Sequence, residues 1–324
     1  MRLLDLITQS SASQCNLPAA WTLPAPHHFV DAVQACPLRL VLADDLTRCA
    51  TALAYAEGDQ LSGCLDLLRA PSERLWVEWA AAPRHEALCA VPTLKIEPAA
   101  SPGRAGVLIH SEASGLTGTI RTFWSTPDDR TYCAAMISEF DLTLPIRNST
   151  SIAEPFAGGS FGVSLPEEPA LDALLSHIRL RWDPAWANYY RSANLSTQQS
   201  SAVLCAALGS TAFDIPMLFA LFLLMSAKNG VRQRGVNLER LNRARLLAGR
   251  PALVEHVEVS MNLLSHRSEY PLNENGKIPL RRRLHHVRGH LARRGHRIFW
   301  RSPHLRGNPR IGVVQSRTIE LAFH

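Results

Sequence analysis

The chain has 324 residues, of which 46% are hydrophobic and 19% charged, so it is long enough for two domains and can bury a core of ordinary size. Its seven cysteines are odd in number, widely spaced and without a CxxC pair, which argues against a disulfide framework and against a cysteine-based zinc site. The formal net charge is +6, but residues 281–324 hold eleven Arg and a single acid, Glu320, so residues 1–280 carry −4. An acidic body with a basic end favours a polyanionic partner.

The first part of the chain predicts helices followed by an antiparallel sheet. Residues 1–70 are expected to be helical with proline-rich breaks, and the short apolar run at the start holds Asp5, so we expect no signal peptide. The segment ERLWVEW, residues 73–79, alternates as a half-buried strand does. Further strands are predicted at 103–110, 118–125 and 130–144, with short breaks rich in Pro, Gly and Asp between them. This pattern is typical of a meander.

A stretch rich in Pro and Gly, residues 146–170, separates two predicted parts of the chain. It predicts a loop or linker between residues 1–145, which hold the helices and the meander, and residues 171–324. The second part is expected to be a helical segment that ends in a basic helix–hairpin module.

The most apolar stretch of the chain, residues 201–227, predicts two buried helices. Asp214 and Pro216 divide it into halves of about a dozen residues, and each half is shorter than the roughly 20 residues that cross a bilayer. Asp214 is a candidate N-cap, and Pro216 suits the first turn of the second helix. We therefore expect a cytoplasmic protein without a membrane span.

A further helix and strand are predicted before the basic end. The segment VNLERLNRARLLAG has Asn237 as its candidate N-cap, Gly249 at its C′ position and Pro251 beyond it. Residues 254–264 alternate apolar and polar side chains, which predicts a strand.

The basic end predicts a helix laid on a β-hairpin. Leu284, Val287 and Leu291 are spaced i, i+3, i+7, so we expect a helix from about residue 280 to 294 with Gly295 at its C′ position. Residues 297–302 and 311–323 predict the two strands of the hairpin. Three arginines in the first helical turn would oppose the helix dipole, which favours an anion bound near the helix start.

Three kinds of chemistry suit this end of the chain. The first is nucleic-acid binding, because guanidinium groups make bidentate contacts with phosphate and an aromatic ring stacks on unpaired bases. One of Phe299 and Trp300 must face the core of a strand, so at most one of them is available for stacking. The expected contacts are Arg281, Arg282, Arg283, Arg293, Arg294, Arg297, Trp300, Arg301 and Arg310.

The second chemistry is metal-independent cleavage of a phosphodiester. His290 and His304 would serve as general base and acid, and Arg288 and Arg306 would stabilise the developing charge. The third is zinc binding, since His286 and His290 would share a helical face, but no acid or cysteine lies near them. We therefore expect no metal and no cofactor.

The C-terminal motifs HHVRGHLARRG and FWRSPHLRGNP, followed by a terminal strand, resemble a signature of a protein family found in bacteriophages, prophages and bacterial genomes. The pieces RLWVEW, RAGVLI and LNRARLLAGRPAL are also similar to that family. The resemblance covers patches of the middle and last third of the chain. It implies a phage-related or bacterial cytoplasmic setting, and it implies no catalytic residues because the family has no assigned activity.

The sequence thus predicts an α+β protein with a helical N-terminal part, an antiparallel sheet, central helices and a C-terminal basic helix plus β-hairpin. The expected function is nucleic-acid binding, to DNA or RNA, through the arginine-rich C-terminal module. The alternatives are an enzyme that acts on nucleic acid or nucleotide, and a structural or interaction protein whose basic end docks on an acidic partner.

Overall fold

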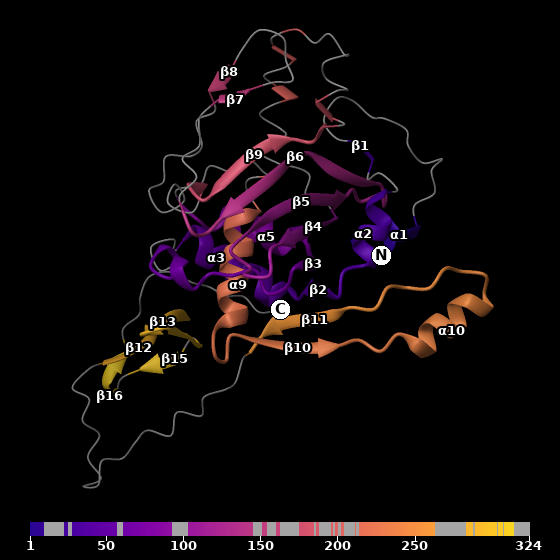
Figure 1. Ribbon diagram of the computed structural model, residues 1–324. Coiled ribbons are helices and arrows are strands. Elements are labelled where there is room, and N and C mark those ends of the chain that lie inside the picture. The colour runs from indigo at the N-terminus through magenta and orange to yellow at the C-terminus, as the bar shows by residue number, and fades with distance from the viewer. Residues whose placement is uncertain are drawn as a thin grey trace. The chain divides into compact units, whose positions relative to one another are not determined.

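The computed structural model is an α+β protein made of two compact units (Figure 1). Unit 1 is Met1–Met225 with Val231–Met261, and unit 2 is Ser226–Gly230 with Asn262–His324. This division differs from the predicted boundaries at 145 and 171. Most of the predicted linker, 146–170, lies outside the described residues and stays a prediction. The structure describes residues 1–9, 23–24, 28–56, 61–92, 103–144, 151–153, 160–162, 175–184, 186–187, 196, 198–199, 202–203, 211, 214–262, 283–287, 289–302, 304–306 and 308–313.

A large mixed sheet forms the centre of unit 1. Among the described residues it has nine strands, in the order β10-β11-β2-β3-β4-β5-β6, with β1 and β9 both paired to β6. The bounds are β1 Leu23–Pro24, β2 Leu38–Leu42, β3 Arg74–Ala80, β4 Arg104–Ser111, β5 Thr117–Ser125, β6 Thr131–Asp141, β9 Ile178–Trp182, β10 Val231–Gly235 and β11 Val257–Met261.

The predicted meander is confirmed in β3 to β6, which pair antiparallel in chain order. The rest of the sheet was not predicted, because β2 lies parallel to both β3 and β11. A parallel pair needs a long crossover, and α3 (Asp44–Tyr55) and the 3-10 turn η2 (Leu65–Leu67) provide it between β2 and β3. Residues 1–70 were expected to be helical with proline-rich breaks, so the strand β2 was missed.

Helices cover both faces of this sheet. On one face, α1 (Leu3–Gln9) and α2 (His28–Gln34) bury their apolar side chains against Trp76, Leu108 and Phe123. On the other, α9 (Ile215–Ser226) packs Phe219 edge-on against Phe140 of β6, with ring centroids 6.4 Å apart. Helices α3 and α5 (Ala81–Cys89) pack on each other. No helix in the described part of the chain is both long enough and apolar enough to cross a membrane.

A buried carboxylate holds the first helix to the sheet. Glu78 of β3 is fully buried, and its two oxygens accept hydrogen bonds from four donors. The backbone N–H groups of Leu3 and Leu4, at 3.2 and 2.8 Å, are the open donors of the N-terminus of α1. The indole of Trp76 donates at 3.3 Å and the guanidinium of Arg104 at 2.7 Å. Because all four hydrogen bonds are made to a carboxylate, they are charge-assisted, so Glu78 stabilises the fold and is not free for catalysis.

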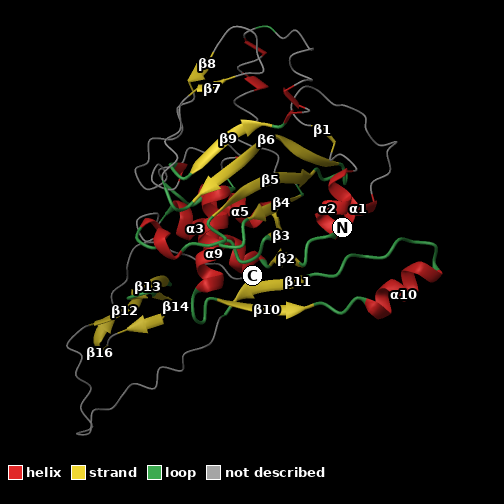
Figure 2. Ribbon diagram, viewed as in Figure 1, coloured by secondary structure: helices red, strands yellow, loops and turns green. Residues whose placement is uncertain are grey.

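Unit 2 is made of strands where a helix was expected (Figure 2). Its described strands are β12 Arg283–Val287, β13 His290–Arg294, β14 Arg297–Arg301, β15 His304–Arg306 and β16 Asn308–Val313. β12 pairs with β15 and β16, and β13 pairs with β14. A two-stranded pair, β7 (Ser151–Ala153) and β8 (Ser160–Gly162), lies elsewhere in the chain.

The predicted helix at 280–294 is therefore wrong. Leu284 belongs to β12 and Leu291 to β13, so their helical spacing is a coincidence between two strands that Gly289 separates. The helix would also have placed three arginines at the positive end of its own dipole, which is unfavourable. Gly295 does need a special backbone conformation, with φ of +59°, but it turns a hairpin and does not end a helix.

Candidate nucleic-acid interface

The centre of the candidate site is the hairpin of β13 and β14. The strands are antiparallel, with Arg294 opposite Arg297, so Gly295 and His296 form a two-residue turn. Gly295 has φ of +59° and the φ of His296 is not positive, which is the pattern of a type II′ turn with Gly at its first central position. This turn fixes the register of the hairpin, and the register decides which arginines share a face.

One face of the hairpin is apolar and buried. Leu291, Ile298 and Trp300 are 9%, 5% and 7% exposed, and Leu291 lies directly opposite Trp300. The chain at Lys228 extends this small sheet, since Lys228 N donates to Ile298 O and Trp300 N donates to Lys228 O, both at 3.1 Å.

The other face of the hairpin carries positive charge. We call His290, Arg294, Arg297 and Arg301 the cationic face. In the register of the hairpin, His290 lies opposite Arg301 and Arg294 opposite Arg297, with the half-buried Phe299 between them. Alternation along the strands brings these four side chains to one surface. The three arginines are exposed.

The arginines of the cationic face differ from many of those in unit 1 in having no ion-pair partner among the described residues. No described carboxylate lies within 4.0 Å of Arg294, Arg297 or Arg301. In unit 1, exposed arginines such as Arg48 and Arg130 contact Glu86 and Asp128, both at 2.8 Å. An unpaired, solvated guanidinium remains available to a phosphate.

The structure places some of the predicted contacts together on one surface and buries another. Arg294, Arg297 and Arg301 are brought together, whereas Arg293 points away from them and donates from Nε to the Gly295 carbonyl at 2.9 Å. Trp300 is buried, so the prediction that it stacks on a base is wrong. Its neighbour Phe299 lies on the cationic face and is half-buried.

The remaining predicted contacts lie in strands whose side chains are not described, or outside the described residues. Arg283 is in β12, His304 and Arg306 are in β15, and Arg310 is in β16. Outside the described residues are Arg281, Arg282 and Arg288.

The histidines of the catalytic and zinc hypotheses do not lie on one helix. His286 and His290 lie on different strands, so the shared helical face that suggested zinc does not exist. Within the described residues, no group of three His, Cys, Asp or Glu side chains could hold a metal ion. His290 and His304 belong to two separate sheets, and their proposed acid–base partnership stays a prediction.

Unit 1 carries a second set of exposed arginines, to which the sequence patterns gave no function. Arg232 and Arg234 lie on β10, and Arg240, Arg243 and Arg250 follow in and after α10 (Glu239–Leu247); all five are exposed. The alternation of Arg in VRQRG and the Arg-rich sequence of the predicted helix were the signals that could have identified them.

Comparison of the chain with protein-family models, curated proteins and solved structures gives no match.

Proposed function

We propose that the protein binds nucleic acid through the cationic face of unit 2. The observation that supports this most strongly is that three exposed arginines share one face of a two-stranded hairpin with no described carboxylate within ion-pairing distance. Each guanidinium can neutralise one backbone phosphate, which releases condensed counterions and drives association. The half-buried ring of Phe299 in their midst offers an edge for contact with a base.

The C-terminal motifs add a setting to this proposal. Their similarity to phage- and prophage-encoded proteins supports a phage- or mobile-element-related protein that works in the bacterial cytoplasm. Nucleic acid is the abundant polyanion in that setting. The alternative is an acidic protein partner. It would have to place carboxylates to match the hairpin, and its binding would release fewer counterions than binding to nucleic acid.

The proposal is tested by a triple substitution, R294Q/R297Q/R301Q, assayed by fluorescence anisotropy with a labelled DNA duplex and a labelled single strand. The matched control is R48Q/R130Q/R179Q, which removes the same number of charges from arginines that are exposed but ion-paired in unit 1. We expect the first variant to bind far more weakly and the control to bind as wild type does. Equal weakening of both would show that only net charge matters. Full binding by the cationic-face variant would leave an acidic protein as the partner.

A further inference from the structure

The strands β10 and β11 and the chain between them form an arm of unit 1. β10 pairs only on one side, with β11, and β11 joins the sheet through β2, so β10 is the outer strand at this edge of the described sheet. Residues 236–256 connect the two strands and include the nine-residue helix α10. Figure 1 shows the arm extending away from the rest of the sheet with α10 at its far end. We define the arm as residues 231–261.

Hydrogen bonds within the arm hold α10 in place. Asn242 makes two bonds to Leu253, donating from its side chain to the carbonyl at 2.9 Å and accepting from the N–H at 2.7 Å. The N-cap residue is Leu238, one position after the predicted Asn237, and the Asn237 side chain accepts from Glu239 N at 2.9 Å. Gly249, with φ of +68°, closes the helix as predicted, and Arg250 N donates to Arg245 O at 2.8 Å. The arm is therefore a preformed element.

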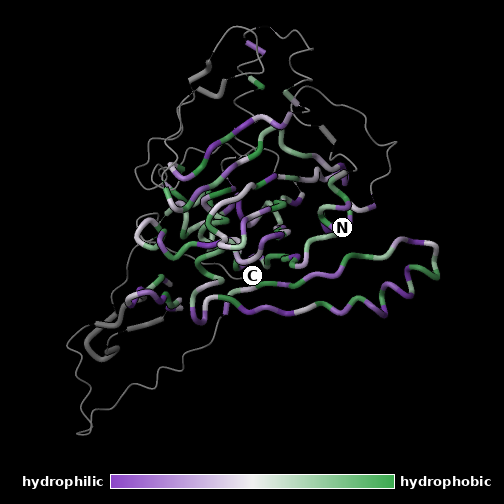
Figure 3. Tube along the Cα trace, viewed as in Figure 1, coloured by the Kyte–Doolittle hydropathy of each residue, from purple (hydrophilic) through white to green (hydrophobic). Residues whose placement is uncertain are grey.

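The arm is positively charged on an otherwise acidic body. It contains six Arg and three Glu, whereas residues 1–230 contain fifteen basic and twenty-two acidic side chains, a net charge of −7. Hydrophilic residues predominate along β10 and α10 (Figure 3), and every residue from Arg232 to Gly235 is exposed. The arm is thus a second basic region, separate in sequence from unit 2.

The outward side of α10 combines charge with an exposed leucine. Leu238, just before the helix, is buried, and Arg240, Arg243 and Leu247 are spaced i, i+3, i+7 on the opposite side of the helix. Leu247 is 86% exposed and Leu246 is 61% exposed. Apolar side chains this exposed and this close together mark an interaction surface.

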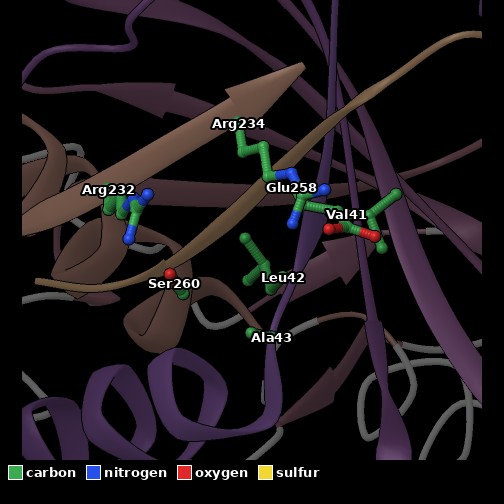
Figure 4. A pocket seen from close by; sticks show the side chains of 7 residues that line it. All are labelled: Val41, Leu42, Ala43, Arg232, Arg234, Glu258 and Ser260. Atoms are coloured by element: carbon green, nitrogen blue, oxygen red, sulfur yellow. The ribbon is translucent and has the colours of Figure 1, made fainter. Parts of the chain in front are cut away.

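At the base of the arm, a pocket of about 400 Å³ continues the basic surface (Figure 4). Arg232 and Arg234 line it from β10, with Ser260 on β11 and Val41 on β2. Alternate residues on a strand lie about 6.6 Å apart on one face, so the two guanidinium groups form a short row. The one acid in the lining, Glu258, lies 3.9 Å from Arg2, which offsets its charge.

We propose that the arm is a second nucleic-acid-binding element that enters a groove of a duplex. This inference rests on the proposed function of unit 2, because it assumes that the chain binds nucleic acid. The major groove of B-DNA is about 12 Å wide and admits one helix, and α10 lies at the far end of the arm, beyond the strands that join the sheet. Arg232, Arg234 and Arg240 contact phosphates along its length, whereas Arg243 pairs with Glu239 at 3.3 Å within the helix.

Leu247 makes the apolar contact with the bases. A leucine between arginines suits the methyl groups and base edges that a groove presents. An acidic peptide with an apolar side chain would also complement the positive charge of the arm and the exposed Leu247. It would not require arginines spread from the pocket at the base of the arm to the helix at its end. The nucleic-acid assignment accounts for both ends of the arm.

The test compares R232Q/R240Q and L247A with wild type, using duplex DNA at a series of salt concentrations. R232Q/R240Q is expected to lower the slope of log affinity against log salt by about 1.8, or about 0.9 for each phosphate contact. The charge-retaining R232K/R240K is expected to keep the wild-type slope. L247A is expected to weaken binding roughly tenfold at an unchanged slope, since it removes one buried apolar contact.

The outcomes separate this inference from the proposed function. If the arm variants bind as wild type does while the cationic-face variant is weakened, the arm proposal is overturned and the function of unit 2 stands. Such a result would assign the arm to a protein partner. If the arm variants are weakened and the cationic-face variant is not, the arm proposal stands and the role of unit 2 fails. Absence of binding by the wild-type chain overturns both.

Discussion

The buried carboxylate of Glu78 gives a quantitative test of how unit 1 is held together. In Glu78→Gln the side chain keeps its shape but loses its charge, and one of its two oxygens becomes an NH2 group. Oε2 accepts from Leu4 N at 2.8 Å and from the Trp76 indole at 3.3 Å, while Oε1 accepts from Leu3 N and from Arg104. In either orientation of the amide, its NH2 group therefore faces two N–H donors from which the carboxylate oxygen had accepted hydrogen bonds.

The expected loss follows from the burial of the group. Glu78 is 0% exposed, so water does not replace the acceptor lost by the two backbone N–H groups and the indole, although the side chain of Arg104 is 23% exposed. Breaking a buried ion pair by removing one partner costs about 3–5 kcal/mol, and each hydrogen bond to a charged group contributes about 1.5–3 kcal/mol. We expect Glu78→Gln to lower the free energy of unfolding of unit 1 by about 3–5 kcal/mol, a large share of the stability of a typical domain.

Urea denaturation followed by tryptophan fluorescence measures this loss, because Trp76 and Trp79 are buried in unit 1. The matched control is Glu86→Gln. Its carboxylate pairs with Arg48, but the two side chains are 60% and 46% exposed, so the expected cost is about 0–1 kcal/mol. If Glu78→Gln costs no more than Glu86→Gln, the carboxylate does not hold α1 to the sheet and the reasoning is refuted.

Two further predictions concern unit 1. Burial raises the pKa of Asp5, although its bond from Val254 N at 2.9 Å lowers it, so the charged form costs stability once the pH exceeds the unfolded value near 3.8. Asp5→Asn keeps a side-chain oxygen that can accept from Val254 N, and we expect its thermal midpoint to exceed that of wild type at pH 7. The difference between the two midpoints should narrow as the pH falls towards 4, and a difference that does not change with pH would contradict this. Gly115 and Gly249 both have φ of +68°, but an added Cβ at Gly115 would lie 2.5 Å from the Ala70 carbonyl and at Gly249 would meet nothing within 4 Å. Gly249→Ala should cost about 1–2 kcal/mol from the backbone alone and Gly115→Ala clearly more in thermal denaturation, and equal costs would refute the assigned clash.

Sequence patterns predicted the elements whose signals are local. The strands β3 to β6 are apolar segments separated by turn residues, and α10 follows Asn237, whose side chain binds Glu239 N, and has a C′ glycine at Gly249. β2 was missed because a parallel strand flanked on both sides reads as a continuous apolar run, which a helix also shows. β9 was missed because its five residues lie within a stretch read as helical.

The sequence predicted which region of the chain holds the candidate site, but it did not predict how the side chains of that region are arranged. The density of arginine at the end of the chain identified the region, but a helical spacing of Leu284, Val287 and Leu291 gave the wrong local structure. Which arginines share a face depends on the register set by the turn at Gly295, and that register follows from strand pairing. Once the segment is read as a hairpin, the burial of Trp300 follows from alternation alone.

The central claim is most directly tested by the salt dependence of nucleic-acid binding. The affinity of wild type and of R294Q/R297Q/R301Q for one duplex is measured from low to moderate salt. If the three arginines each contact a phosphate, the wild-type slope of log affinity against log salt is steep, and the variant loses about 2.7 from its magnitude. Binding that does not change with salt, or a variant slope equal to that of wild type, would contradict the assignment of the cationic face.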